Sequence, residues 1–230
     1  MSSTSLLPAS SGPATTFYNE LTFLNVFRLV QALVYMGLAF SPTGLGWPSV
    51  PDPAFAHHVA EAYLLFALVS LLLNRRSMPH ARLAVSVALV VDIVGALLAI
   101  TAMREAHIGI AMMLAVNLSA GALILPLRLS SFFAALATLG TLGHTLLDAT
   151  QASSSDRDLL EAALFGLAYF ATTTLCHVLG RQLRATEALA EQRSTDLANL
   201  AQVNELIIRR MKTGVLLVDD ANRIHQINES

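Results

Sequence analysis

Six polar or ionisable side chains interrupt apolar stretches of the sequence, where a bilayer would surround them. They are Arg28, Glu61, Asp92, Asn117, His144 and His177. A charge at the centre of a bilayer costs at least about 2.5 to 3.5 kcal/mol on insertion scales, so each such group should face other protein groups and find a partner. Groups of this kind either recognise a ligand or partner helix, or join neighbouring helices by hydrogen bonds that average about 0.6 kcal/mol.

Asp92 is the strongest of these candidates, because the stretch ALVVDIVGAL places it near the middle of an apolar run. Asn117, in MLAVNLSAG, is expected at a similar depth, so a hydrogen bond between the two is geometrically open. Arg28 lies nearer the cytoplasmic side of its run and would approach Asp92 by snorkelling. With Glu61, these residues are candidates for an intramembrane sensing site. The alternative is a hydrogen bond that only fixes helix packing.

The histidines give no strong metal signal. His57 and His58 would share a helix face with Glu61, but two or three ligands do not make a closed site, and interfacial side chains explain them better. His144 and His177 are expected to lack a carboxylate or second histidine at matching depth. We therefore predict no metal, no catalytic residue and no cofactor in this chain.

The composition requires elements that cross a membrane. The chain is 54% hydrophobic and 13% charged, whereas a soluble domain is about a quarter charged. A membrane helix needs about 20 mostly apolar residues. The stretches that qualify are Thr22–Phe40, His57–Leu73, Ala81–Ala102, Ile108–Pro126, Leu129–Asp148 and Leu159–Leu179. The predicted fold is an all-α membrane protein, with a six-span helix bundle over residues 22–181.

The arginines indicate how these spans are oriented. With the N-terminus inside, the outer connections hold only Arg104 and Arg157, and the inner ones hold Arg75, Arg76, Arg82, Arg128, Arg181 and Arg184. Positive residues favour the cytoplasmic side, so we predict a multi-pass protein with both termini in the cytoplasm. Residues 1–21 are expected to be a disordered cytoplasmic tail. The net charge of −2 and the lack of a basic stripe argue against nucleic acid as a partner.

The composition changes over residues 182–212, where glycine and proline vanish and charge rises. Apolar residues recur at helical spacing, which predicts a coiled-coil signalling helix and a homodimer. One register places Leu183, Ala190, Leu197, Asn204 and Met211 at position a, and a shifted register uses Leu200, Val203 and Ile207. Asn204 at position a would favour a parallel dimer. The two registers are either noise or the bistable element that a signalling helix needs.

Residues 213–230 predict the beginning of a different fold. Thr213 and Gly214 end the helix, since glycine suits the position just past a C-terminus. The segment GVLLVDDANRIHQIN predicts strands over Val215–Val218 and Arg223–Ile227 with a turn between them. A lone hairpin is marginal in water. We therefore expect a larger sheet domain, truncated at Ser230, and interpret the chain as the input half of a signalling protein.

The junction between helix and hairpin resembles that of PilS-type sensor histidine kinases, in which a helix runs into a PAS domain. The residues that carry the resemblance in the helix are Asn204, Glu205, Leu206, Ile207, Ile208, Arg210 and Met211. Those in the hairpin are Thr213, Gly214, Val215, Asp219, Ile224 and Asn228. The six spans ahead of the junction are similar to that family in number and arrangement.

The resemblance implies a sensor of a two-component system in the bacterial cytoplasmic (inner) membrane that controls type IV pilus genes. It implies a pilin helix as the ligand sensed in the membrane and a response regulator as the phosphorelay partner. It also implies ATP and Mg in a kinase domain. The 230 residues contain no His-Glu-x-x-Asn-Pro type phosphoacceptor box and no glycine-rich ATP-binding box, so we expect no kinase activity from them alone.

Two other functions stay open at this point. The first is that the same input module drives another output, such as a cyclic-nucleotide enzyme, and the second is a six-span transporter or channel. The spans lack the matched pair of broken segments that transporters use, and a pore needs no helix running into a further fold. Under the sensor hypothesis, Asp92→Asn is expected to alter signalling while the protein still inserts.

Overall fold

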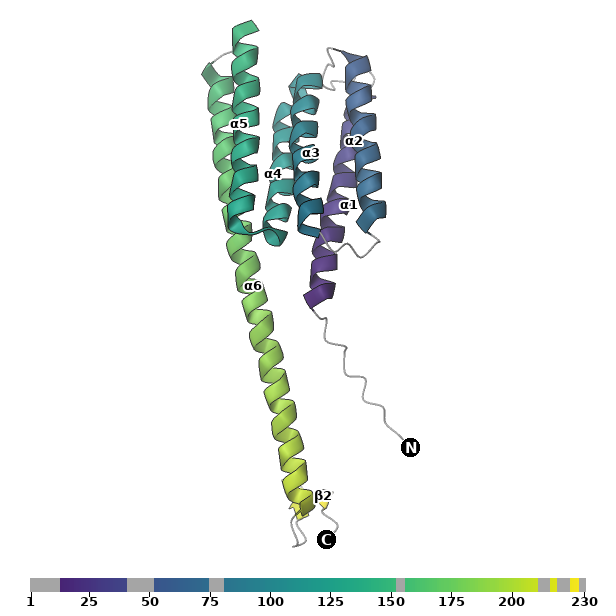
Figure 1. The fold of residues 1–230 in the computed structure, drawn as a ribbon, viewed down its shortest axis with the longest axis vertical. Coiled ribbons are helices and arrows are strands. Elements are labelled where there is room, and N and C mark those ends of the chain that lie inside the picture. The colour runs from purple at the N-terminus through teal and green to yellow at the C-terminus, as the bar shows by residue number, and fades with distance from the viewer. Residues whose placement is uncertain are drawn as a thin grey trace. The chain divides into compact units, whose positions relative to one another are not determined.

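The computed structural model describes residues 13–40, 52–74, 81–151, 156–210, 216–218 and 224–227. It divides into two compact units, residues 1–179 and 180–230. In chain order the elements are α1 (Pro13–Ala39), α2 (Pro53–Asn74), α3 (Ala81–Ala102), the 3-10 helix η1 (Arg104–Ala106), α4 (His107–Ile124), α5 (Leu127–Gln151), α6 (Asp156–Arg210), β1 (Leu216–Val218) and β2 (Ile224–Ile227) (Figure 1).

Within the described residues, six helices are long and apolar enough to cross a membrane. The candidate spans are Leu21–Ala39, Pro53–Leu73, Arg82–Ala102, Arg104–Ile124, Leu127–Ala149 and a segment of α6 within Arg157–Leu200. They coincide with the six spans predicted from the sequence, which confirms the all-helical, multi-pass fold of this region. Proline marks several boundaries, because its fixed φ suits a first helical turn and its missing N–H cannot continue a helix.

The first helix begins earlier than the sequence indicated. We expected residues 1–21 to be a disordered tail, but α1 already starts at Pro13. Proline is favoured at the first helical position, where its absent N–H would have no intrahelical partner in any case. The helix then continues without interruption into the apolar stretch. Residues 1–12 lie outside the described residues.

The spans pack through small side chains. Helix α1 contacts α2 and α4, and α3 contacts α2, α4 and α5. The faces that meet carry fully buried alanines, including Ala32, Ala60, Ala96 and Ala134. Large apolar side chains such as Leu65 instead remain exposed, as is normal where lipid is the solvent. Association in lipid depends on close packing rather than on the hydrophobic effect, so small residues belong at these interfaces.

In the second unit, the part of α6 from Arg181 onward is a single helix whose described side chains are exposed. Its exposed apolar side chains include Leu183, Leu189, Leu197, Leu200, Val203, Leu206 and Ile207. The dimeric coiled coil therefore stays a prediction. The side chains of Asn204 and Glu205 are not described, and Met211, Thr213, Gly214 and Asp219 lie outside the described residues.

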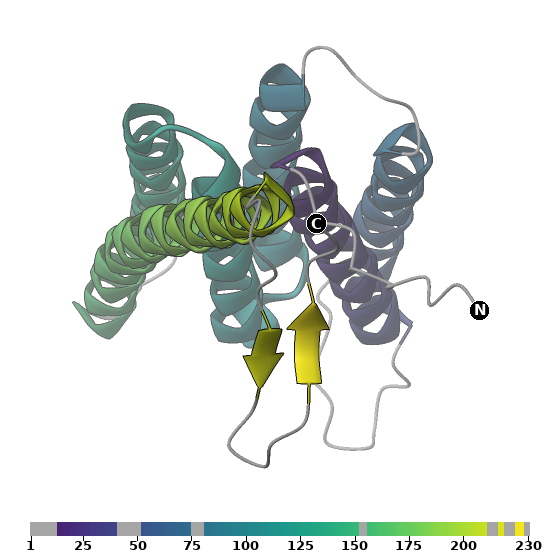
Figure 2. The ribbon, with the colours of Figure 1, turned by 90° about the horizontal axis from the view of Figure 1, so that it is seen from below.

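Strands β1 and β2 form an antiparallel pair, seen as two neighbouring arrows in Figure 2. Leu216 lies opposite Ile227, Leu217 lies opposite Gln226, and the register shifts between Leu217 and Val218. Both strands fall inside the segments in which the sequence predicted them. Their assignment to a PAS domain stays a prediction.

Candidate functional site: a buried polar network among the spans

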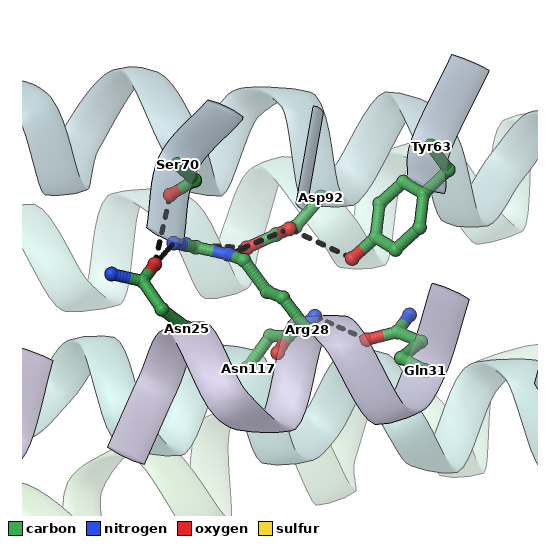
Figure 3. Close-up of polar contacts among 7 residues, drawn as sticks. All are labelled: Asn25, Arg28, Gln31, Tyr63, Ser70, Asp92 and Asn117. Atoms are coloured by element: carbon green, nitrogen blue, oxygen red, sulfur yellow. Dashed lines mark hydrogen bonds and ion pairs between the residues drawn. The ribbon is translucent and has the colours of Figure 1, made fainter. Parts of the chain in front are cut away.

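An ion pair between Arg28 on α1 and Asp92 on α3 lies at the centre of the network (Figure 3). The Arg28 Nη2 donates to Asp92 Oδ2 at 2.7 Å, and Nε lies 3.0 Å from Oδ1 and 2.9 Å from Oδ2. Only 1% of Arg28 and none of Asp92 is exposed. The planar guanidinium fork matches a carboxylate in geometry and charge, so the pair is neutral as a unit inside the bundle.

Side chains from α1 and α2 complete the surroundings of this pair. The Tyr63 hydroxyl donates to Asp92 Oδ1 at 2.9 Å. Asn25 Oδ1 accepts from Arg28 Nη1 at 3.1 Å and from the Ser70 hydroxyl at 2.8 Å. The Phe66 ring centroid lies 5.7 Å from Arg28 Cζ, within the range of a cation–π contact. The charged groups are thus satisfied from three helices, and α1, α2 and α3 are tied together.

A second branch joins α4 to α1. Asn117 Nδ2 donates to Gln31 Oε1 at 2.7 Å, and Gln31 Nε2 donates to the Tyr35 hydroxyl at 2.7 Å. The Tyr35 ring packs at 45° to the Tyr63 ring with centroids 5.1 Å apart, which brings the two branches into contact. All four side chains are buried. Asn117 Oδ1 has no hydrogen-bond partner among the described residues.

Helical spacing explains how these side chains come to one face. Asn25, Arg28 and Gln31 follow one another at intervals of three, and Tyr35 lies four residues after Gln31. Positions three and four apart share a helix face, so all four point from α1 into the bundle. The sequence analysis identified Arg28 as a candidate but missed Asn25, Gln31 and Tyr35. Their common spacing within an apolar helix was the signal that would have found them.

The structure decides the partner of Asp92. The sequence leaves both Asn117 and Arg28 open as partners of Asp92, and the structure shows that Arg28 binds Asp92 directly while Asn117 bonds to Gln31. The reason is electrostatic as well as geometric. An arginine cancels the buried negative charge of the carboxylate, whereas a neutral amide leaves that charge in a medium of low dielectric constant.

The other candidates lie away from the network. Glu61 lies in the first half of α2, where its side chain is 58% exposed and its carboxylate lies 3.9 Å from His58. His177 Nδ1 donates to the Ala122 carbonyl at 3.3 Å. His144 has Asp148 as a neighbour on the next turn, at 3.8 Å. The expectation that His144 lacks a nearby carboxylate was therefore wrong. Within the described part of the chain, no three His, Cys, Asp or Glu side chains are arranged to hold a metal ion.

The network is suited to fixing one arrangement of the spans rather than to chemistry on a substrate. Breaking a buried ion pair leaves an uncompensated charge, so any shift of α1 against α3 must either keep the pair or pay a large penalty. Buried hydrogen bonds in a low-dielectric region also strengthen one another. The ion pair therefore opposes any gradual sliding of α1 against α3.

Tyr63 and Tyr169, two of the buried tyrosines at membrane depth, offer a matched test of the network. Tyr63→Phe removes the hydrogen bond to Asp92 and is expected to lower the free energy of unfolding by about 1.5 to 3 kcal/mol. The Tyr169 hydroxyl is buried without a hydrogen-bond partner among the described residues, so Tyr169→Phe is expected to leave stability unchanged or raise it. Denaturant unfolding of both variants in micelles measures the difference. Equal effects would show that the hydroxyl of Tyr63 contributes nothing to the network.

Together, the fold and the site define a six-span membrane domain held by a buried polar network. Residues 18–190 match the PilS-like transmembrane domain. The match covers more than half of the chain, and the chain therefore belongs to this family. The PilS-type resemblance predicted from the junction is confirmed for the membrane region.

A curated relative agrees with this assignment. The Sensor protein kinase PilS of Pseudomonas aeruginosa is 33% identical to the chain over 122 residues, which are 53% of this chain and 23% of that protein. The matched region is thus less than a quarter of the relative's length. No solved structure matches the chain.

Proposed function

We propose that the chain is the membrane sensor and signal-transmission region of a two-component sensor histidine kinase, and that it controls type IV pilus genes by sensing pilin in the inner membrane. The observation that carries the proposal is the closed Arg28–Asp92 network inside a PilS-type membrane region. Both charges bind to protein groups rather than lining a path across the bundle, which favours a sensor over a transporter.

Recognition of pilin would occur between helices in lipid. A single transmembrane helix is recognised through close packing and interhelical hydrogen bonds, and small residues permit the approach. A helix that docks against α1 or α2 would favour one arrangement of the spans over another. Because the Arg28–Asp92 pair is costly to break, the response would be a movement of tied helices between discrete positions.

Transmission would follow α6, since the sixth span and residues 180–210 belong to one helix. The exposed apolar positions of its second part, such as Leu197 and Leu200, would pair with a second copy in a parallel coiled coil. Both termini would then lie in the cytoplasm, with a PAS domain following the helix. ATP, Mg and a response regulator would act at the kinase domain of the whole protein.

The proposal is tested in cells that carry the full-length protein with and without pilin. Phosphorylation of the response regulator is expected to change several-fold when pilin is removed. The Arg28→Leu/Asp92→Leu double variant, which keeps an apolar and uncharged interior, is expected to lose that dependence. Glu61→Gln, an exposed change on α2 away from the network, serves as the control and should keep it. A regulator signal that is indifferent to pilin, from correctly inserted protein, would contradict pilin sensing.

A further inference from the structure

A cavity of about 230 Å³ lies at the end of the bundle where α3 ends and where α4 and α6 begin. Its charged and titratable lining consists of Arg104 from η1, His107 from α4, His144 and Asp148 from α5, and Asp158 and Glu161 from α6. Helix α3 contributes Ile100, which does not titrate. None of these residues belongs to the Arg28–Asp92 network.

His107 lies between two hydrogen-bond acceptors. Its Nδ1 is 2.7 Å from the Arg104 carbonyl oxygen, and its Nε2 is 3.3 Å from Glu161 Oε2. A carbonyl and a carboxylate can only accept, and a neutral imidazole carries a single N–H. Only the doubly protonated ring therefore donates to both groups at once. The neutral ring keeps one contact at most and turns a lone pair toward the other acceptor.

His144, on α5, also lines the cavity and has a polar neighbour at each ring nitrogen. Its Nε2 is 2.9 Å from the Thr101 hydroxyl oxygen, and that hydroxyl donates its own hydrogen to the Leu97 carbonyl. Nε2 must then be the donor to Thr101, while Nδ1 faces Asp148 Oδ2 at 3.8 Å. Asp148 also accepts from Arg104 Nη2 at 3.3 Å. The charged form of His144 again suits both neighbours.

We propose that the polar contacts of His107 and His144 around this cavity respond to protonation and hold the start of α6 against α4. We call this set of contacts the joint. Protonation of His107 completes the bridge from the Arg104 carbonyl to Glu161, and protonation of His144 completes the contact with Asp148. Histidine is the side chain whose charge ordinarily changes between about pH 5 and 8. The lining carries one arginine against three carboxylates, so the two added protons also remove its excess of negative charge.

The joint has a consequence for α6, the helix that holds the predicted signalling segment. In the described residues, α6 is bound to α4 through His107–Glu161 near its start and His177–Ala122 in its membrane part. Deprotonation weakens the first of these contacts and leaves the second. The position of the N-terminal turns of α6 thus depends on the pH at this end of the bundle.

The pH dependence of unfolding tests the joint in the full chain, reconstituted in lipid nanodiscs. The doubly protonated ring of His107 donates to both the Arg104 carbonyl and Glu161, and unfolding removes both contacts. The stabilisation that they give is therefore expected at acidic pH, where a histidine ring is charged, and not at alkaline pH. The thermal midpoint of the wild-type chain is expected to exceed that of His107→Gln or Glu161→Gln at about pH 5.5, but not at about pH 8, on either side of the histidine range. The His107→Gln/Glu161→Gln double variant should lose no more than either single change.

His58→Gln is the matched control, because His58 lies at the same end of the bundle, is 80% exposed and pairs only loosely with Glu61. It should keep the pH response of the wild-type chain. Nitrogen NMR of labelled histidine, with His107→Gln used to assign the signal, gives a direct second measurement. Both His107 ring nitrogens should be protonated at about pH 5.5 and one at about pH 8. A variant effect of equal size at both pH values, or a ring that stays neutral under acid, would overturn the proposal.

Discussion

Asp92→Ala is expected to lower the free energy of unfolding by roughly 3 to 5 kcal/mol, because it leaves the Arg28 guanidinium buried and unpaired. Arg28→Ala should have a similar effect, since the Asp92 carboxylate would then lose the partner that cancels its charge. The Arg28→Leu/Asp92→Leu double variant removes both charges and should recover most of the loss. Buried ion pairs replaced by apolar side chains often cost little stability.

The same reasoning adds a stability effect to the expectation that Asp92→Asn alters signalling while the protein still inserts. An asparagine still accepts a hydrogen bond but no longer neutralises Arg28, so this variant should also be less stable. Unfolding in denaturant, with equal membrane insertion verified for each variant, measures these differences. Glu61→Ala serves as the control and should remain within about 0.5 kcal/mol of the wild type, as exposed changes usually do. A double variant as unstable as Asp92→Ala would contradict the ion-pair account.

Gly95→Ala is expected to cost about 1 to 3 kcal/mol through overpacking. A methyl group at this position would lie 2.8 Å from Tyr63 Cδ2 and 3.0 Å from Cε2, so the aromatic ring would have to move. That ring carries the hydroxyl bound to Asp92, and a displaced ring also loses this hydrogen bond. The effect of one methyl group on α3 should therefore reach the centre of the network.

Gly37→Ala is the comparison that isolates the role of close packing. Nothing lies within 4 Å of a methyl group added there, so the change should raise stability by up to about 1 kcal/mol through helix propensity alone. A double-mutant cycle then locates the cause of the Gly95 effect. In a Tyr63→Ala background, Gly95→Ala should cost little. An undiminished cost in that background would show that the ring of Tyr63 is not what the methyl group meets.

The six spans were predictable because membrane helices are specified locally. A run of about 20 apolar residues forms a membrane-spanning helix whatever other helices surround it, and charged residues and proline mark where the run ends. A helix end that lies outside the apolar run is harder to predict, which is why the start of α1 at Pro13 was missed. The hairpin strands also fell where turn residues and alternating apolar residues placed them.

The partners within the site were decided by the tertiary structure. The sequence determined that Arg28, Asp92 and Asn117 are polar groups at membrane depth, each needing a partner. Whether Asp92 meets Arg28 or Asn117 depends on how α1, α3 and α4 are rotated and which helices are neighbours. Those rotations arise from close contacts between residues far apart in the chain, such as Gly95, which has no side chain, against the ring of Tyr63. Local hydrophobicity carries no information on such contacts, so only the packed bundle shows that the charge on Asp92 is cancelled by Arg28.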